Sequence, residues 1–235
     1  MHYQTQLMQF TDLQVGINDE DLVSFGDFFA LENSSVDQNT FVNMAKVDVW
    51  ILPFLNIMGI YGQGDNSIDG QLFLDEEFRQ ALIDYGWLVD LDPNSIPEAI
   101  DIVTKVSSRM YGGGLTLAGG VGNWNLALNY QLMFAELTEV NTTQMANVFT
   151  PTVGYMTDIG LNIMAGAQGQ FYDTQVVGFI NLEDGNVLNY QVDFEPVRWN
   201  FLVGFYKGFA KHWEVAIQGG FGDRESLTAV FGYRF

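Results

Sequence analysis

The histidines and their nearest acids are the residues whose types could support acid–base or nucleophilic chemistry. His212 precedes Glu214 by two residues, so both side chains point the same way in an extended segment. A hydrolase of the Ser-His-acid type also needs a serine beside such a pair. The candidate, Ser226, is expected at the opposite end of the neighbouring strand. A surface turn is therefore the favoured interpretation of His212, and we predict no catalytic residue.

Oxygen-bearing side chains between residues 90 and 101 could bind calcium. Asp90, Asp92, Asn94, Glu98 and Asp101 fall at positions 1, 3, 5, 9 and 12 of a loop that resembles an EF-hand. Ser95 replaces the glycine of that loop, and Asp101 replaces its bidentate glutamate. A capping box at the start of a helix explains Ser95 and Glu98 without a metal. The solvated helix cap is the favoured interpretation, and Ca²⁺ is the alternative.

Alternation of apolar and polar residues predicts the strands that position the remaining polar side chains. Trp124, Leu126, Leu128, Tyr130 and Leu132 alternate with Asn125, Ala127, Asn129, Gln131 and Met133. Successive side chains of a strand point to opposite faces, so this segment has one apolar and one mostly polar face. Similar segments begin near residues 40, 54, 111, 145, 161, 199, 213 and 224.

The last twelve residues carry the same pattern and end on an aromatic residue. Leu227, Ala229, Phe231, Tyr233 and Phe235 share one face. Here the sequence resembles the bacterial outer-membrane β-barrel proteins, whose closing strand typically ends in Phe. The resemblance spans residues 40–235 and implies an all-β, transmembrane, antiparallel up-and-down barrel. Such barrels have even strand numbers, so nine strands plus one from residues 1–38 predict ten, with eight and twelve as alternatives. A soluble β-sandwich or ligand-binding barrel is the other interpretation.

A membrane barrel places apolar residues against lipid and polar residues in its lumen. The expected lumen-lining residues are Lys46, Asp48, Asn129, Gln131, Gln168, Gln170, Glu214 and Arg234. The charged ones could form a lumenal network or a structural ion pair that fills the barrel. Trp124, Trp199 and Trp213 stand at strand ends, where aromatic girdles meet headgroups.

The chain is expected to form one domain, residues 1–235, with two irregular parts. Residues 1–39 are predicted to be an N-terminal strand or a segment that plugs the lumen through the apolar cluster at 25–31. Residues 64–109 are predicted to be an extracellular helical insertion, with helical spacing over 75–88 and a helix from Ile96 to about Ser107. Short turns near Pro53, Gly122, Ile159 and Ala210 would face the periplasm.

Charge and composition limit the partners. The net charge of −20 argues against nucleic acid, because phosphate binding needs clustered Lys and Arg. The acids gather in the expected loops. A solubilising, like-charged surface is the favoured interpretation, and divalent ions that bridge the acids to lipopolysaccharide are the alternative. The sequence contains no run of about 18 apolar residues, so we predict no membrane-spanning helix. It also contains no cysteine. Met1 opens no signal peptide, and we expect one to have been removed from a protein of the outer membrane. The barrel-assembly machinery would recognise the C-terminal strand.

Three functions fit this reading. The first is a porin-like channel or uptake protein for a small solute, supported by small and polar inward residues. The second is a closed barrel that presents the helical insertion to a surface partner. A lipid-modifying enzyme is the least favoured, because histidine is scarce.

Overall fold

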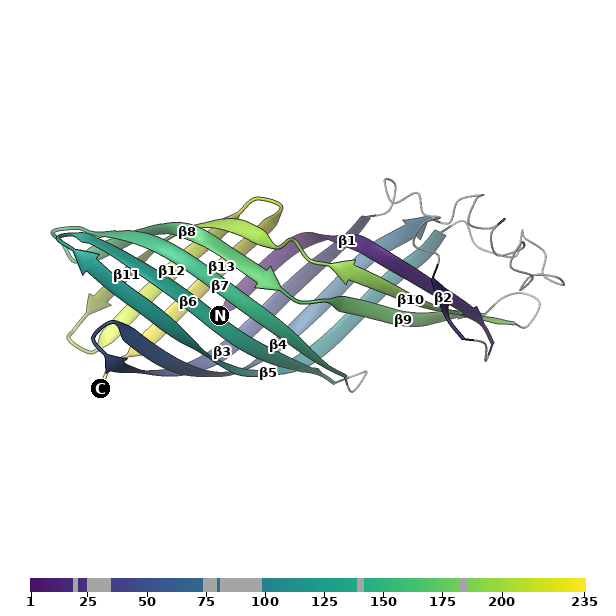
Figure 1. The fold of residues 1–235 in the computed structure, drawn as a ribbon, viewed down its shortest axis with the longest axis horizontal. Helices are drawn as coiled ribbons and strands as arrows, with labels where there is room; N and C mark the ends of the chain where they lie inside the picture. Colours follow the sequence, from purple (N-terminus) through teal and green to yellow (C-terminus); the bar gives the residue numbers. More distant parts are fainter. Residues whose placement is uncertain (19–20, 25–34, 74–79, 81–98, 139–141, 182–185) are drawn as a thin grey trace.

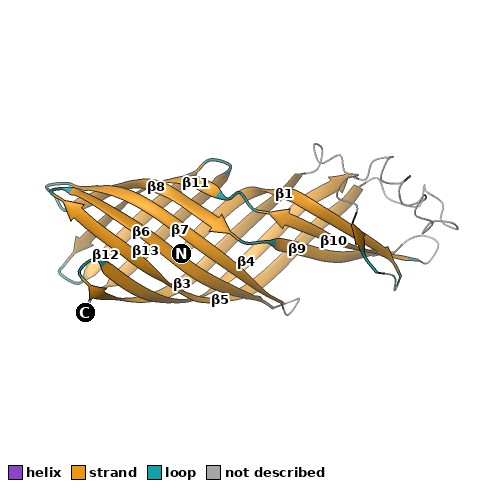
Figure 2. Ribbon diagram, viewed as in Figure 1, coloured by secondary structure: helices purple, strands orange, loops and turns teal. Residues whose placement is uncertain are grey.

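The computed structural model describes residues 1–18, 21–24, 35–73, 80, 99–138, 142–181 and 186–235, most of them in strands (Figure 2). The strands are β1 (His2–Ile17), β2 (Val23–Ser24), β3 (Ser35–Leu52), β4 (Leu55–Phe73), β5 (Ala99–Val121), β6 (Trp124–Leu137), β7 (Thr142–Met156), β8 (Leu161–Phe171), β9 (Thr174–Asn181), β10 (Val187–Glu195), β11 (Trp199–Phe209), β12 (Trp213–Phe221) and β13 (Arg224–Tyr233). Among the described residues, no helix is long and apolar enough to cross a membrane. The predicted all-β fold class is confirmed.

Ten strands close into an antiparallel barrel (Figure 1). Their hydrogen-bonded order is β1-β3-β4-β5-β6-β7-β8-β11-β12-β13, and β13 pairs again with β1. The prediction of ten strands is confirmed, with β1 as the strand expected from residues 1–38. The four predicted short turns join β3 to β4, β5 to β6, β7 to β8 and β11 to β12 at one end of the ring, here called the turn end. At one of them Gly122 has φ +61°, a backbone conformation that glycine adopts without strain.

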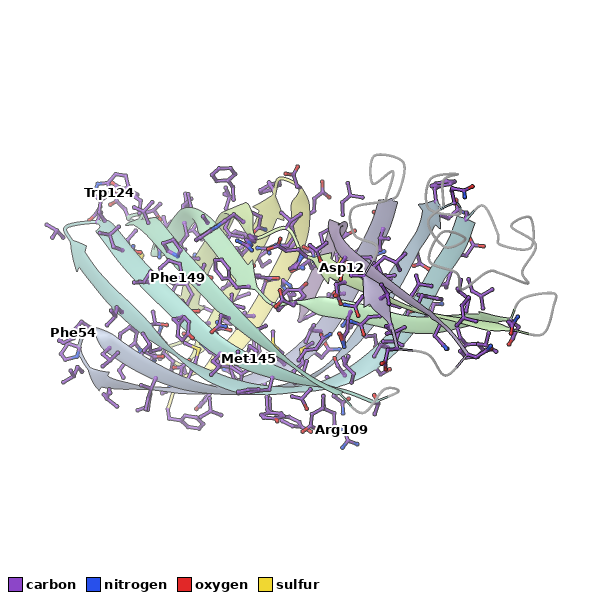
Figure 3. All side chains as sticks on the ribbon, turned by 45° about the vertical axis from the view of Figure 1, so that its right-hand side comes forward. Asp12, Phe54, Arg109, Trp124, Met145 and Phe149 are labelled. Carbon is purple, nitrogen blue, oxygen red and sulfur yellow. The ribbon has the colours of Figure 1, made fainter. Side chains whose placement is uncertain are left out.

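The ring carries apolar side chains outside and mostly polar or small ones inside. On β6 the outward Trp124, Leu126 and Tyr130 are exposed, whereas the intervening Asn125 and Asn129 are half-buried. Figure 3 shows Trp124 and Phe54 projecting from the turn end. The arrangement matches the predicted faces of the strands and is inverted relative to a sheet with an apolar core.

A bulge in β1 shifts the alternation of its sequence beyond the ring. In its first half β1 points Gln4, Gln6 and Met8 inward and pairs with β3 and β13. Its register shifts between Phe10 and Asp12, and its second half pairs with β10 and β2. The extra residue moves the buried face from even to odd positions.

The strands β2, β9, β10 and the second half of β1 form the sheet that we call the upper sheet. Its buried apolar side chains are Leu13, Val15, Ile17, Val176, Leu188, Tyr190, Val192 and Phe194. The intervening residues of β10 are Val187, Asn189, Gln191, Asp193 and Glu195, which are half-buried and mostly polar. This is the apolar-in, polar-out pattern of a sheet in water.

The predicted helix from Ile96 to about Ser107 is wrong from Ala99 onward. Residues 99–109 belong to β5 and pair with residues 63–73 of β4, so most of the described part of the expected insertion is strand. The run Ile102-Val103-Thr104 explains this, because β-branched residues lose side-chain freedom in a helix and pack well in a strand. The capping box, nearly all of the spacing at 75–88 and the apolar cluster at 25–31 lie outside the described residues.

Candidate functional site: the barrel lumen

A layer of amide side chains crosses the lumen near the end of the ring opposite the turns. This glutamine layer consists of Gln4, Gln6, Gln38, Gln168, Gln170 and Tyr172. Gln170 on β8 donates to the Gln4 Oε1 on β1 at 3.1 Å, although β11, β12 and β13 lie between these two strands in the ring. Gln6 donates to the Tyr172 hydroxyl at 2.9 Å. Side chains therefore bridge opposite walls at this level.

Arg224, the first residue of β13, is fully buried beside the layer. Its Nη1 donates to the Val197 carbonyl at 2.7 Å, and its Nη2 donates to the Gln168 carbonyl at 2.8 Å and the Asn200 Oδ1 at 2.7 Å. These partners are neutral oxygens. Hydrogen bonds to the N–H groups of a buried cation make its burial tolerable; both Nη atoms have them, whereas Nε has no hydrogen-bond partner among the described residues. Arg224 thereby links β8, β11 and β13.

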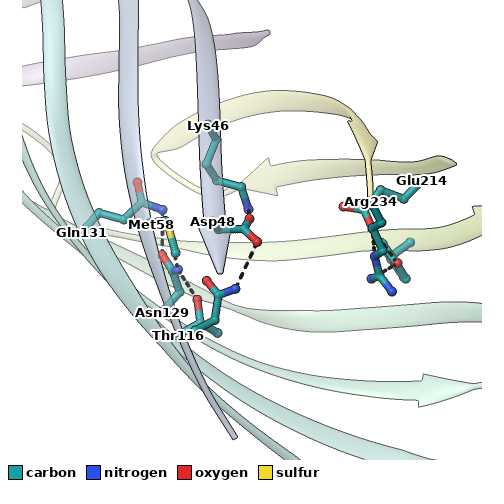
Figure 4. Close-up of polar contacts among 10 residues, drawn as sticks. Lys46, Asp48, Met58, Thr116, Asn129, Gln131, Glu214 and Arg234 are labelled. Carbon is teal, nitrogen blue, oxygen red and sulfur yellow. Dashed lines mark hydrogen bonds and ion pairs between the residues drawn. The ribbon is translucent and has the colours of Figure 1, made fainter. Parts of the chain in front are cut away.

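Two ion pairs lie nearer the turn end (Figure 4). Lys46 Nζ is 2.6 Å from Asp48 Oδ2 on β3. Arg234 Nε is 2.6 Å from Glu214 Oε2 on β12. All four side chains remain partly exposed to solvent, so each pair contributes only about 0–1 kcal/mol to stability. These pairs supply fixed charges to the lumen rather than rigidity.

The amides of β6 form a further cluster on the part of the wall built by β4, β5 and β6 (Figure 4). Asn129 donates to the Thr116 hydroxyl at 2.8 Å, and Gln131 donates to the Asn129 Oδ1 at 2.7 Å. The small inward residues of β5 make room for them. A Cβ on Gly114 would lie 2.3 Å from the Tyr130 carbonyl oxygen, so a side chain there would collide with β6.

The structure groups the eight expected lumen-lining residues into four pairs. Lys46 and Asp48 form one ion pair with Asp48 bound to Asn56, Glu214 and Arg234 form the other pair, and Asn129 contacts Gln131. The remaining two, Gln168 and Gln170, join the glutamine layer.

Sequence reasoning missed the residues of β1 and β3 that complete this layer. Gln4, Gln6 and Gln38 are almost fully buried. The signal was present, because Gln4 and Gln6 alternate with Tyr3, Thr5 and Leu7. Arg224 gave no comparable signal beyond its place at the start of the last strand.

The other candidate residues lie away from the lumenal network. His212 Nδ1 is 2.9 Å from the Arg234 carbonyl, and its ring stacks on Tyr233. Ser226 pairs with Gly220 of β12, eight residues after His212 in the sequence. Of the expected calcium loop, Asp101 lies in β5 and accepts a 2.8 Å hydrogen bond from Gln71. The other four members, at positions 90, 92, 94 and 98, lie outside the described residues.

Two carboxylates face each other on the upper sheet. Asp12 on β1 and Asp193 on β10 are direct partners in the ladder. Burial raises the pKa of Asp193, and the neighbouring Asp12 and Asp173 raise it further. Ser24 and Gln14 donate to Asp12 at 2.6 and 3.1 Å.

Comparisons with known proteins give no family assignment. No protein-family model and no curated protein matches the chain. Similar solved structures include the KdgM porin in complex with disordered oligogalacturonate, at 8% identity and TM-score 0.37, covering 100% of this chain and 99% of that one. A mutant of the TodX monoaromatic hydrocarbon channel has 9% identity and TM-score 0.42, covering 100% and 90%. The toluene transporter TbuX of Ralstonia pickettii has 11% identity and TM-score 0.38, covering 100% and 89%. Likeness at this level identifies neither a family nor a function for this chain.

Proposed function

We propose that this chain is an outer-membrane barrel that conducts a small polar solute, with the glutamine layer as the gate of its lumen. One observation carries the proposal, namely the polarity of the ring. Exposed aliphatic and aromatic side chains face outward, whereas amides and two ion pairs face inward. A barrel in lipid needs this arrangement, and a barrel in water does not.

The height of the apolar band supports the same proposal. The outward face of β11 carries Trp199, Phe201, Val203, Phe205 and Phe209, with Lys207 between the last two, and the strand has eleven residues. A membrane-spanning strand needs about 9–11 tilted residues. Aromatic residues at both ends of this run would lie at the two headgroup levels. The turn end would then face the periplasm and the upper sheet the outside, since such barrels have short periplasmic turns.

Single-channel conductance of the detergent-folded protein in a planar bilayer tests the proposal. Gln38→Ala removes two hydrogen bonds of the layer, one of them from Tyr172. Net hydrogen bonds of about 1 kcal/mol each predict a roughly fivefold rise in open probability when one cross-lumen bond is lost. Gln63→Ala is the matched control, because Gln63 is exposed on the outward face of β4. Failure of the folded protein to insert would refute the membrane location.

A second candidate function is a closed barrel that presents the upper sheet to a surface partner. The bridges across the lumen and the apolar core of the upper sheet favour it. Insertion without conductance, in the wild type and in Gln38→Ala alike, would select this function. A channel block by millimolar calcium would support the calcium loop at 90–101, which stays a proposal.

A further inference from the structure

The barrel wall is incomplete toward the turn end, between β3 and β13. β1 pairs with residues 36–42 of β3 and 224–228 of β13. Met1 adds two backbone bonds to Ala229, of 3.0 and 2.9 Å. Beyond this point β3 pairs only with β4, and β13 only with β12, within the described chain. We call the gap between residues 43–50 of β3 and 230–233 of β13 the slot. Figure 1 shows the N-terminus partway along the barrel.

Burial along β3 changes where its pairing with β1 ends. The inward residues Val36 and Val42 are 0% and 3% exposed, whereas the inward Met44 and Trp50 are 40% and 51% exposed. The outward Val47 is 80% exposed. Both faces of β3 are therefore open along the slot, as expected for a strand with a missing neighbour.

The strands on both sides of the slot have unpaired backbone N–H and C=O groups that face it. In an antiparallel ladder roughly every second residue turns both its N–H and its C=O toward a given neighbour. About half of residues 43–50 therefore present unpaired groups to the slot. Lipid tolerates only closed barrels, because each unpaired backbone group in hydrocarbon is strongly unfavourable. β3 and β13 run in the same direction, since both are antiparallel to β1. One strand antiparallel to both would satisfy the two edges together.

We propose that the slot accepts one further β-strand, in line with β1 and joined to its amino end. The β1–β3 register pairs Tyr3 with Phe41, so the strand would face Met44 through Trp50, which is seven residues. Its alternate side chains would point outward between the exposed Ala45, Val47 and Val49 and should be apolar. The others would point toward Lys46 and Asp48 and should be small or polar. The proposal does not rest on solute conduction.

Hydrogen–deuterium exchange of the detergent-folded protein tests the slot. One variant carries seven residues of alternating Val and Ser before Met1, and a matched variant carries the same number with prolines, which lack the N–H donor. The reference is β4 from residue 55 to 62, which is paired on both edges. We expect the amides of β3 between 44 and 50 that face the slot to exchange at least about tenfold faster than the reference, with protection restored by the alternating extension only.

Two results would overturn the proposal. In one, the alternating extension protects residues 44–50 no more than the proline extension does. In the other, these amides are already as protected as the β4 reference in the unextended chain. A particle mass twice that of the monomer would then assign the protection to a second copy. Loss of conductance leaves this readout unchanged, so the failure of either proposal can be distinguished.

Discussion

Deletion of Thr11 and Asp12 together should detach the upper sheet while the ring stays folded. Thr11 is the extra residue of the β1 bulge, so deletion of Thr11 alone removes the bulge and leaves the later side chains on their faces. When Asp12 is deleted as well, every later side chain changes face, because strand residues alternate. Leu13, Val15 and Ile17, now buried, would turn toward water, and Gln14 would turn toward the apolar core.

The energy involved is large compared with the stability of a small sheet. Exposing one buried Leu, Val or Ile side chain costs about 1.5–3 kcal/mol, so the three together cost roughly 5–9 kcal/mol. Burying the Gln14 amide without a hydrogen-bond partner adds to this. The sum reaches the range of a whole domain's stability, about 5–15 kcal/mol. The β1–β10 ladder is therefore not expected to survive in the shifted phase.

Hydrogen exchange resolves the two halves of the molecule. In the double-deletion variant, amides of β10 should lose most of their protection, and amides of β12, which lie in the ring, should keep theirs. Deletion of Thr11 alone is the control, because it shortens β1 and keeps the faces of the later side chains. If β10 stayed as protected in the double-deletion variant as in the control, the alternation of β1 after the bulge would not hold the upper sheet in place.

Three further changes test local packing, charge and turn geometry. Gly114→Ala should destabilise the folded barrel by about 1–3 kcal/mol through its collision with a β6 carbonyl, whereas Gly119→Ala, with open space around its Cβ, should leave the unfolding temperature unchanged; equal effects would contradict the geometry. The pKa of Asp193 is raised, so its ionisation disfavours folding only as the pH rises through that pKa. Asp193→Asn should therefore raise the unfolding temperature of the upper sheet at about pH 7 and not at about pH 3, and a gain at both would refute the titration argument. Ala210 and Lys211 have φ of 49° and 66°, so replacing them by Asn-Gly should stabilise the hairpin by roughly 1 kcal/mol in a denaturant titration, and no gain would mean that these residues are unstrained.

Alternation predicted the ring strands because each of them has one apolar and one polar or small face. Residues 124–133 are the clearest case, and their predicted start is that of β6. The same signal failed at residues 99–107, where a capping box outweighed a run of β-branched residues. The helix prediction used a local motif, whereas the actual structure depends on pairing with β4, which the motif does not report.

The sequence predicted which face of its strand each site residue occupies, but not which other residues it contacts. Phase alone placed Gln168 and Gln170 inside the barrel. Their contacts depend on how far each strand is staggered against the others, and Gln170 meets Gln4 from 166 residues away. A bulge such as that of β1 also interrupts the alternation of apolar and polar residues in the sequence. The continuation of the strand is then not recognised, although the alternation has only changed phase.

The energetics of the glutamine layer favour a gate over a permanent plug. Three of its bonds cross the lumen, joining Gln4 to Gln170, and Tyr172 to Gln6 and Gln38. At about 1 kcal/mol each, they hold the layer shut by roughly 3 kcal/mol, which leaves it open about 1% of the time. The buried Gln6 Oε1 has no hydrogen-bond partner among the described residues, which further destabilises the closed layer. The wild-type channel should therefore flicker, with brief openings of constant amplitude. Long openings in the wild type, unchanged in Gln38→Ala, would show that the solute takes a path that avoids the layer.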